Sequence, residues 1–384
     1  MKPRFLAMIA STLSIYLAIH WFIGWNGWIF LSTAFHLEHS VWYWICFWFL
    51  AFSYLLARAG SRFLPGPLAR FLKMIGSYWF AVMQFALLLL LIADIVALIL
   101  YSASIRGSSV ILILGSAVSL ILLVLMIQGS WNAWNPIVRK YELAIAKPAG
   151  GMRQLRIAVA SDLHLGTIVG NTHLQRLVDR VNALKPDLIL LPGDVIDDDI
   201  EPFIREKMGN VMGKLQARYG IYAVPGNHEY YGGHIPAFIE EMKAIGIEVL
   251  MDRCVKLADC FYVIGRKDKT AEGVGQGGRM DLDALLSGVD KSLPLIMMDH
   301  QPHHLDKAAA AGIDVMLSGH THRGQMAPNH RITRKLFELD WGYLKKNSMH
   351  AIVSSGFGTW GPPIRIGSRS EIIEVILSFE DRAI

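Results

Sequence analysis

Long apolar runs dominate the first third of the chain and are separated only by short polar stretches. A helix that spans a bilayer needs roughly 20 mostly apolar residues, and four of these runs are about that long. We therefore expect transmembrane helices at residues 5–23, 41–57, 75–101 and 110–128. A signal peptide would also fit Lys2, Arg4 and the first run, but no small-residue cleavage site follows and more apolar runs come next.

The pattern changes at about residue 155, where short runs of β-branched and other apolar residues alternate with segments of helical period. Strand 156–161 is followed by helix 172–184, for which Asn171 is a candidate N-cap. The same alternation predicts strands at 187–191, 221–224, 248–251, 261–264, 295–298, 314–317, 351–354 and 372–377, and helices at 203–216, 235–245 and 304–311. Alternating strands and helices indicate a layered α/β domain.

These patterns divide the chain into a transmembrane region at 1–130, a linker at 131–154 and an α/β domain at 155–384. Composition agrees, because 53% of the 384 residues are hydrophobic and the mean hydropathy is +0.36, where a soluble protein would lie below zero. Three cysteines, Cys46, Cys254 and Cys260, give no disulfide framework and favour a reducing compartment.

The net charge of +5 comes with basic residues that are unevenly placed around the expected spans. The connection between spans one and two has no Lys or Arg, and that between spans three and four has only Arg106. Basic residues are instead found before span one, between spans two and three, and after span four. They are Lys2, Arg4, Arg58, Arg62, Arg70, Lys73, Arg139, Lys140 and Lys147. The positive-inside rule then predicts a multi-pass protein of the inner membrane with the α/β domain in the cytoplasm. No Arg-rich or stacked-aromatic motif indicates nucleic-acid binding.

A few polar residues occur within or beside the expected spans. Asp94 lies inside the third, where a carboxyl group is costly, so it is either hydrogen-bonded between helices or functional. His20, His36 and His39 lie near span ends, where we expect an interfacial role rather than metal binding.

Side chains that bind metals follow five of the predicted strands. They form the clusters Asp162 with His164, Asp194 with Asp197, Asn227-His228-Glu229, Asp299-His300, and His320 with His322. Ligands at the carboxyl ends of strands meet at one edge of an open α/β sheet, so we expect these clusters to converge. Asp, His and Asn ligands without Cys suit Mn²⁺, Fe or Zn²⁺ rather than Ca²⁺.

The order Asp-x-His, Gly-Asp-x-x-Asp, Gly-Asn-His-Glu, His, Gly-His-x-His resembles the calcineurin-like metallophosphoesterase superfamily, from about Leu155 to the C-terminus. One branch continues the last motif as Gly-His-Thr-His-x-Gly-Gln, here Gly319 to Gln325. It also has the segment Gly-x-Gly-Thr-x-Gly-Pro-Pro-x-Arg, here Gly356 to Arg365. The resemblance implies a four-layer α-β-β-α sandwich and phosphoester hydrolysis at two divalent metal ions about 3.5–4 Å apart.

The resemblance also implies a role for each matched residue. Asp162, His164 and His322 would bind the first metal, and Asn227, His300 and His320 the second. Asp194 would bridge both, and His228 would act as general acid on the leaving-group oxygen. Asp197 and Glu229 would lie behind the ligands, Asp197 orienting a histidine or the backbone and Glu229 orienting His228.

The chain departs from the branch pattern at three places. Arg323 stands where Gly is common, and Ser370 stands where Pro usually precedes Glu-Ile. The segment Arg266 to Met280 is rich in Gly and basic residues, and it could be either a solvated loop or a lid that contacts substrate phosphate. These departures affect substrate specificity rather than the ligand set.

The function we expect first is a membrane-bound phosphoesterase that hydrolyses a phosphodiester or pyrophosphate of a lipid or lipid-linked substrate. Four spans exceed what an anchor requires, and basic residues near the bilayer, Arg139, Lys140, Lys147 and Arg153, would attract anionic lipid. The alternatives are a phosphomonoesterase or nucleotidase on a soluble substrate, and a membrane regulator with a phosphoesterase-like domain. The sequence predicts no oligomeric state.

Overall fold

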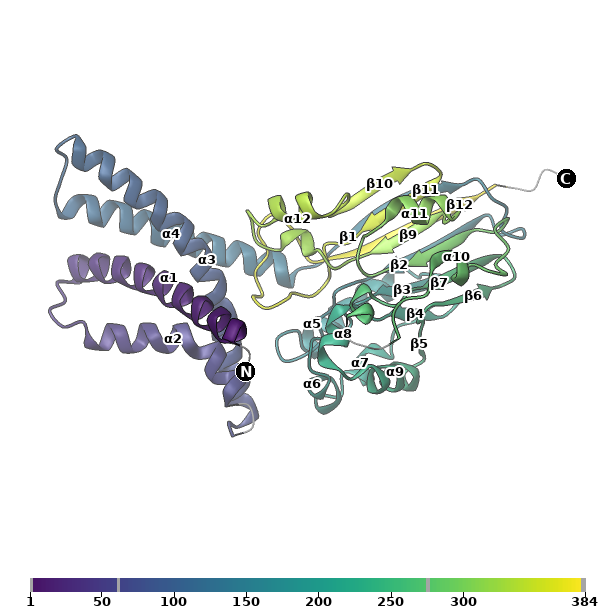
Figure 1. The fold of residues 1–384 in the computed structure, drawn as a ribbon, viewed down its shortest axis with the longest axis horizontal. Helices are drawn as coiled ribbons and strands as arrows, with labels where there is room; N and C mark the ends of the chain where they lie inside the picture. The colour runs from purple at the N-terminus through teal and green to yellow at the C-terminus, as the bar shows by residue number, and fades with distance from the viewer. Residues whose placement is uncertain (1–2, 61–62, 274–276, 381–384) are drawn as a thin grey trace. The chain divides into compact units, whose positions relative to one another are not determined.

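The computed structural model describes residues 3–60, 63–273 and 277–380 (Figure 1). The expectations for Lys2 and Arg62, and those for residues 274–276 of the Arg266–Met280 loop, fall outside the described residues. The chain divides into two compact units, one made of residues 1–130 with 361–364 and the other of residues 131–360 with 365–384.

Four apolar helices account for nearly all of the first unit. They are α1 (Pro3–Phe35), α2 (Val41–Ala59), α3 (Gly66–Ser102) and α4 (Ser108–Trp134). Within the described residues, these four helices are long and apolar enough to cross a membrane. All four include the expected spans and extend past them, most of all α1, because aromatic and small polar residues continue the helix beyond the most apolar run. The 33 residues of α1 measure about 50 Å, longer than a hydrocarbon core of about 30 Å.

Two polar residues of this unit, His20 and Asp94, contact side chains of a neighbouring helix. His20 is fully buried within α1, its Nδ1 lies 2.8 Å from the Tyr16 carbonyl oxygen, and its Nε2 accepts a hydrogen bond of 2.9 Å from Trp79 Nε1. His20 therefore lies near the middle of α1 rather than near the end of a span, as we had expected, and it links α1 to α3. The Asp94 carboxyl group interacts with the Asn26 side chain of α1, which fits the hydrogen-bonded alternative.

Two six-stranded sheets form the second unit (Figure 1). The first sheet has the order β1 (Ile137–Ile145), β12 (Glu371–Phe379), β2 (Gln154–Val159), β3 (Leu188–Pro192), β4 (Ile221–Val224) and β5 (Ile247–Val249). The second has the order β10 (Gly342–Lys346), β11 (Met349–Val353), β9 (Val315–Ser318), β8 (Leu295–Met298), β7 (Phe261–Gly265) and β6 (Arg253–Leu257). Strands β2 to β5 are parallel, as are β7, β8, β9 and β11.

The core lies where the two sheets face each other. Alternate residues of β2, such as Ile157 and Val159, pack in one cluster with Val263 of β7 and Ile296 of β8. The other face of the second sheet packs against α10 (Leu282–Leu285) and α11 (Leu305–Ala310). The remaining helices are α5 (Asn171–Ala183), α6 (Glu201–Arg205), α7 (Gly209–Met212), α8 (Asn227–Gly232), α9 (Ile235–Ala244), η1 (Lys269–Glu272), η2 (His322–Gly324) and α12 (His330–Leu336). The expected two-sheet α/β sandwich after four apolar helices is confirmed.

We expected the segment 131–154 to be a linker, but it contributes a strand to the first sheet. Its residues 137–145 form β1, which pairs in parallel with β12 along its whole length. The burial of β1 alternates, and Leu143 and Ile145 enter the core. A period of two in a short segment indicates a strand even where charged residues interrupt the apolar ones.

The basic residues of this segment are not a free polybasic surface either. Arg139 forms an ion pair of 2.6 Å with Glu371, Lys147 forms one of 2.6 Å with Asp314, and Lys140 forms one of 2.6 Å with Glu142. Charges that are already paired attract an anionic membrane less, so this support for a lipid substrate is withdrawn.

Candidate metal centre

The expected ligands converge where the parallel strands end, at the carboxyl edges of both sheets. Asp162 and His164 follow β2, Asp194 follows β3, Asn227 follows β4, His300 follows β8, and His320 and His322 follow β9. The two edges meet closely, because a Cβ on Gly193 after β3 would overlap the ring of His300 from the second sheet. Tight packing of the strand ends therefore brings the separate motifs into one site.

The first cluster contains Asp162, His164 and His322. The Nε2 atoms of the two histidines are 3.0 Å apart, and His322 Nε2 is 3.4 Å from Asp162 Oδ1. These separations suit ligand atoms that share one metal ion, since metal–nitrogen bonds are about 2.0–2.1 Å long. All three side chains are buried.

The second cluster contains Asn227, His300 and His320. The Asn227 Oδ1 atom lies 3.1 Å from His300 Nε2 and 2.7 Å from His320 Nδ1. Asp194 joins the two clusters, because its Oδ2 is 3.1 Å from His300 Nε2 and 3.8 Å from His164 Nε2. A carboxylate between two groups of ligands can bridge two cations.

Buried partners fix the ligands from behind. His300 Nδ1 lies 2.9 Å from the carbonyl oxygen of Pro192, so it donates there and leaves Nε2 free to bind a metal. Glu229 accepts backbone hydrogen bonds from Gly226 at 2.7 Å, Ile196 at 2.8 Å and Asp194 at 3.2 Å. Glu229 thus holds the turns that carry Asp194 and Asn227, rather than orienting the His228 ring as expected.

His228 lies beside the ligands and faces three carboxylates. Its Nδ1 is 2.7 Å from Asp198 Oδ1 and 3.7 Å from Asp197 Oδ1. Burial opposes protonation of His228, but the hydrogen bond with Asp198 and the charges of Asp194, Asp197 and Asp198 outweigh it and raise the pKa to about 9. Asp197 Oδ1 also lies 3.9 Å from His164 Nδ1, too far for a direct hydrogen bond, so its orienting role stays a prediction.

Backbone strain is concentrated in this site. Five of its residues have left-handed backbone angles, with φ of 53° at Asp162, 47° at His164, 51° at Asp194, 72° at His320 and 48° at His322. Such angles cost roughly 1–3 kcal/mol for each non-glycine residue, and they persist where the surrounding structure fixes them. The left-handed backbone conformation turns each of these side chains, at the end of its strand, toward the common centre of the site.

The neighbouring glycines of the motifs leave room for the ligands. A Cβ on Gly226 would overlap Asp194 Oδ1, and one on Gly319 would overlap Asp162 Oδ2. The glycines of Gly-Asn-His-Glu and Gly-His-Thr-His are therefore required by the close approach of backbone to carboxylate.

The donor set fits divalent cations. Asp162 Oδ2 is buried and has no hydrogen-bond partner among the described residues, an arrangement that is costly unless a cation or water meets it. Burial lowers the pKa of His164 to about 3 and that of His320 to about 4, so both imidazoles are neutral and can bind a metal. Burial also opposes protonation of His300, but the charge of Asp194 outweighs it and raises the pKa. A cation between Asp194 and His300 would replace that proton.

Three further residues contact the site and were not expected from the sequence. Asp198 is one of three consecutive aspartates, and nothing in that run distinguishes it from Asp199. Arg365 is fully buried, donates to the carbonyl oxygens of Ser355 and Gly358, and lies 3.2 Å from His322 Nδ1. The tail motif contained Arg365, but its pattern alone did not indicate what the guanidinium contacts.

Trp360 is the third residue of the site that was not expected from the sequence, and Gln325 holds it in place. Gln325 holds the backbone of Trp360 by two hydrogen bonds of 3.0 Å. The Trp360 ring is 60% exposed and lies 6.4 Å from the ring of His228. The Gln of Gly-His-Thr-His-x-Gly-Gln therefore places an exposed aromatic side chain beside His228.

Comparisons with known proteins agree with the site. Residues 155–324 match the family described as calcineurin-like phosphoesterase. A Danio rerio protein described as a transmembrane protein with metallophosphoesterase domain is 33% identical over 268 residues, which are 66% of this chain and 60% of that protein. An uncharacterized metallophosphoesterase of Aquifex aeolicus is 29% identical over 242 residues, which are 62% of this chain and 91% of that protein.

Among solved structures, a 5'-nucleotidase precursor from Thermus thermophilus is similar with a TM-score of 0.37 and 14% identity. The similarity covers 59% of this chain and 54% of that one. It is too slight to bear on function. The matched part of this chain also spans only 60% of the length of the Danio rerio relative.

Proposed function

We propose that this chain, whose residues 155–324 match the calcineurin-like phosphoesterase family, is a membrane-bound, metal-dependent hydrolase of a phosphodiester or pyrophosphate on a lipid or lipid-linked substrate. The chain combines this domain with four helices able to cross a membrane. The substrate class and the lipid are our proposal.

The observation that carries the proposal is the position of Asp194 between two ligand clusters. Asp162, His164 and His322 would hold one divalent ion, and Asn227, His300 and His320 the other, with Asp194 shared. When bound, two such ions neutralise the phosphoryl oxygens and lower the pKa of a water. The identity we propose is Mn²⁺, Fe or Zn²⁺.

The chain's own acid is His228. Asp198 holds its Nδ1, so Nε2 is the atom left to give a proton to the leaving-group oxygen as the phosphorus–oxygen bond breaks. The raised pKa keeps this ring protonated at neutral pH. Bound cations would lower that pKa toward neutrality, the range in which proton transfer is efficient.

The lipid part of the proposal is supported by α12. This helix has no buried residue, and its Ile332 and Leu336 are 59% and 67% exposed. It packs on η2, because a Cβ on Gly324 would overlap the backbone of Asn329 and His330. Exposed Arg331, Arg334 and Lys335 flank the two aliphatic side chains. Aliphatic and basic residues together suit an anionic lipid–water boundary.

The location in the cell is also part of the proposal. The uneven distribution of Lys and Arg supports a multi-pass protein of the inner membrane whose metal centre is cytoplasmic. The bilayer is the partner that we propose.

The experiment compares one phosphodiester on two carriers, a short-chain soluble form and a lipid form in anionic vesicles. The full-length protein is assayed with the Ile332→Ser/Leu336→Ser variant. Burial of an aliphatic side chain is worth about 1.5–3 kcal/mol, so we expect at least a tenfold loss on the vesicles and no loss on the soluble form. The matched control is Ile204→Ser, which removes an aliphatic residue 47% exposed on α6.

Equal rates of wild type and variant on vesicles would remove the support from α12. Preference for a soluble phosphomonoester over both diesters would favour the nucleotidase alternative.

A further inference from the structure

The loop Arg266–Met280 is fixed at both ends. Asp252 accepts hydrogen bonds from Lys267 N at 3.1 Å and from Met280 N at 2.9 Å, so one carboxylate joins the two ends. Arg266 Nη2 also donates to the Met280 carbonyl oxygen at 2.6 Å. The stem of this loop is therefore structured, and it places Arg266 and Arg279 at defined positions.

The stem borders a cavity of about 270 Å³ that no part of the proposed catalytic cycle uses. Asp299, directly before the ligand His300, and the start of α11 form the other sides. Inside it, Arg279 Nη2 donates to Asp299 Oδ2, and these side chains are only 7% and 4% exposed. A buried ion pair at a cavity of this size marks a built polar site rather than a solvated loop surface.

Several buried polar atoms of the cavity lack hydrogen-bond partners within the described residues. They are the donors Arg266 Nε and Arg279 Nε and the acceptor Asp299 Oδ1. These atoms are covered by neighbouring side chains, so a ligand in the cavity would instead meet the exposed charged groups of the lining, among them Glu272, Asp281 and Lys307.

The charges around the cavity are balanced. Arg266, Arg279 and Lys307 oppose Glu272, Asp281 and Asp299, three against three. An additional phosphate or carboxylate would meet as many acidic groups as basic ones. Hydroxyl groups, which are neutral and can donate and accept at once, match this lining better.

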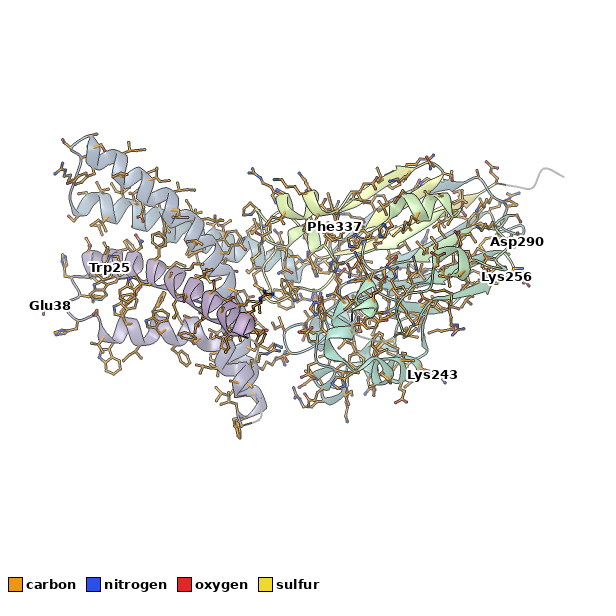
Figure 2. All side chains as sticks on the ribbon, in the orientation of Figure 1. Trp25, Glu38, Lys243, Lys256, Asp290 and Phe337 are labelled. Carbon is orange, nitrogen blue, oxygen red and sulfur yellow. The ribbon has the colours of Figure 1, made fainter. Side chains whose placement is uncertain are left out.

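The cavity is close to the candidate metal centre. The ring of its lining residue His303 lies 5.0 Å from the ring of Phe337, and Phe337 lies 5.8 Å from the ring of the ligand His320. Phe337 is labelled in Figure 2. One aromatic side chain, Phe337, thus lies between the lining of the cavity and the second cluster.

We propose that this cavity binds a hydroxyl-rich group, a sugar or a polyol, on the far side of the phosphoester that the metal centre hydrolyses. This inference rests on the proposed function and specifies its substrate. The hydroxyls would pair with the accessible charged groups of the lining, such as Arg266, Asp281 and Lys307, while the phosphoryl group lies at the two ligand clusters.

The test uses three p-nitrophenyl phosphodiesters whose second ester group is ethyl, 2-carboxyethyl or inositol. All three release the same phenolate, so the metal centre and the leaving group are constant. With the full-length metal-loaded protein, we expect kcat/KM at least tenfold higher for the inositol ester than for the ethyl ester. Arg266→Met should abolish that preference and leave the ethyl ester unchanged.

Because Arg266 also holds the loop stem, Lys307→Met is the second variant. It changes the cavity lining without touching the stem and should reduce the preference for the inositol ester. The matched control is Arg253→Met, which removes an arginine 59% exposed on β6 that pairs with Glu248. It should leave all three rates unchanged.

Equal rates on the ethyl and inositol esters would overturn the inference while the proposed phosphoesterase activity stands. A preference for the carboxyethyl ester would overturn it in favour of an anion site. Failure to hydrolyse any of the three would instead count against the proposed function itself.

Discussion

His228 and Asp198 form the residue contact that most directly links geometry to proton transfer. Replacing Asp198 with Asn removes a negative charge that raises the pKa of His228 and leaves only a neutral acceptor beside Nδ1. The acid then loses its proton at lower pH, so the alkaline limb of the kcat/KM profile should move to lower pH. The neighbouring Asp199→Asn variant is the matched control, because the Asp199 side chain accepts from Glu201 N in its own turn.

Profiles of rate against pH would be measured for the wild type and both variants, together with their metal content. We expect the metal content to be unchanged in both. If the alkaline limb of the profile does not move in Asp198→Asn, then the Asp198 carboxylate does not determine the pKa of the general acid His228.

The sequence predicted which residues come together at the candidate metal centre, but not the contacts that fix their side chains. Strand-end motifs indicated the ligands, because parallel strands end at one edge. Asp198 lies nearer to His228 than Asp197 does because of the geometry of the turn that carries them. The spacing of residues in the sequence does not reveal that geometry. The same is true of Glu229, whose carboxylate turned out to bind three backbone amides.

Strand β1 is the element whose removal should matter most for stability. A soluble fragment that begins at Leu155 lacks β1 and exposes the whole edge of β12. It also loses the buried Leu143 and Ile145, each worth about 1.5–3 kcal/mol. We expect this fragment to unfold at a lower temperature and to aggregate more than one that begins at Trp131. Thermal unfolding and light scattering of the two fragments check this, and equal stability would mean that β1 is dispensable.

The sequence predicted most strands of the sandwich, because buried parallel strands read as continuous apolar runs. It missed β1, β6 and β10, three strands at the edges of the sheets that are only partly buried and carry charged residues at exposed positions. It also merged α6 and α7 into one helix, although Gly209 follows the break. In a strand with only one buried face, only about every second residue needs to be apolar. Such a segment is easily mistaken for a loop in the sequence.

At the scale of the whole molecule, the arrangement of basic residues predicts the orientation in the membrane. Glu38, in the turn between α1 and α2, should face outward, and Lys256 on β6 should face the cytoplasm; both are labelled in Figure 2. In a background with the three native cysteines replaced by Ala, an impermeant thiol reagent on intact cells should label Glu38→Cys and not Lys256→Cys. Both should be labelled after the cells are opened, and the reverse pattern in intact cells would overturn the orientation.

The central claim is that this chain hydrolyses phosphoesters with two metal ions shared through Asp194. Elemental analysis of purified full-length protein, on the same preparation whose turnover of a chromogenic phosphodiester is measured, tests it most directly. The two-metal hypothesis predicts about two divalent ions per chain. It also predicts loss of turnover with a chelator, its return with Mn²⁺, Fe²⁺ or Zn²⁺, and an Asp194→Asn variant with depleted metal and at least about 100-fold lower activity. An active preparation that contains no metal, or full activity in Asp194→Asn, would contradict it.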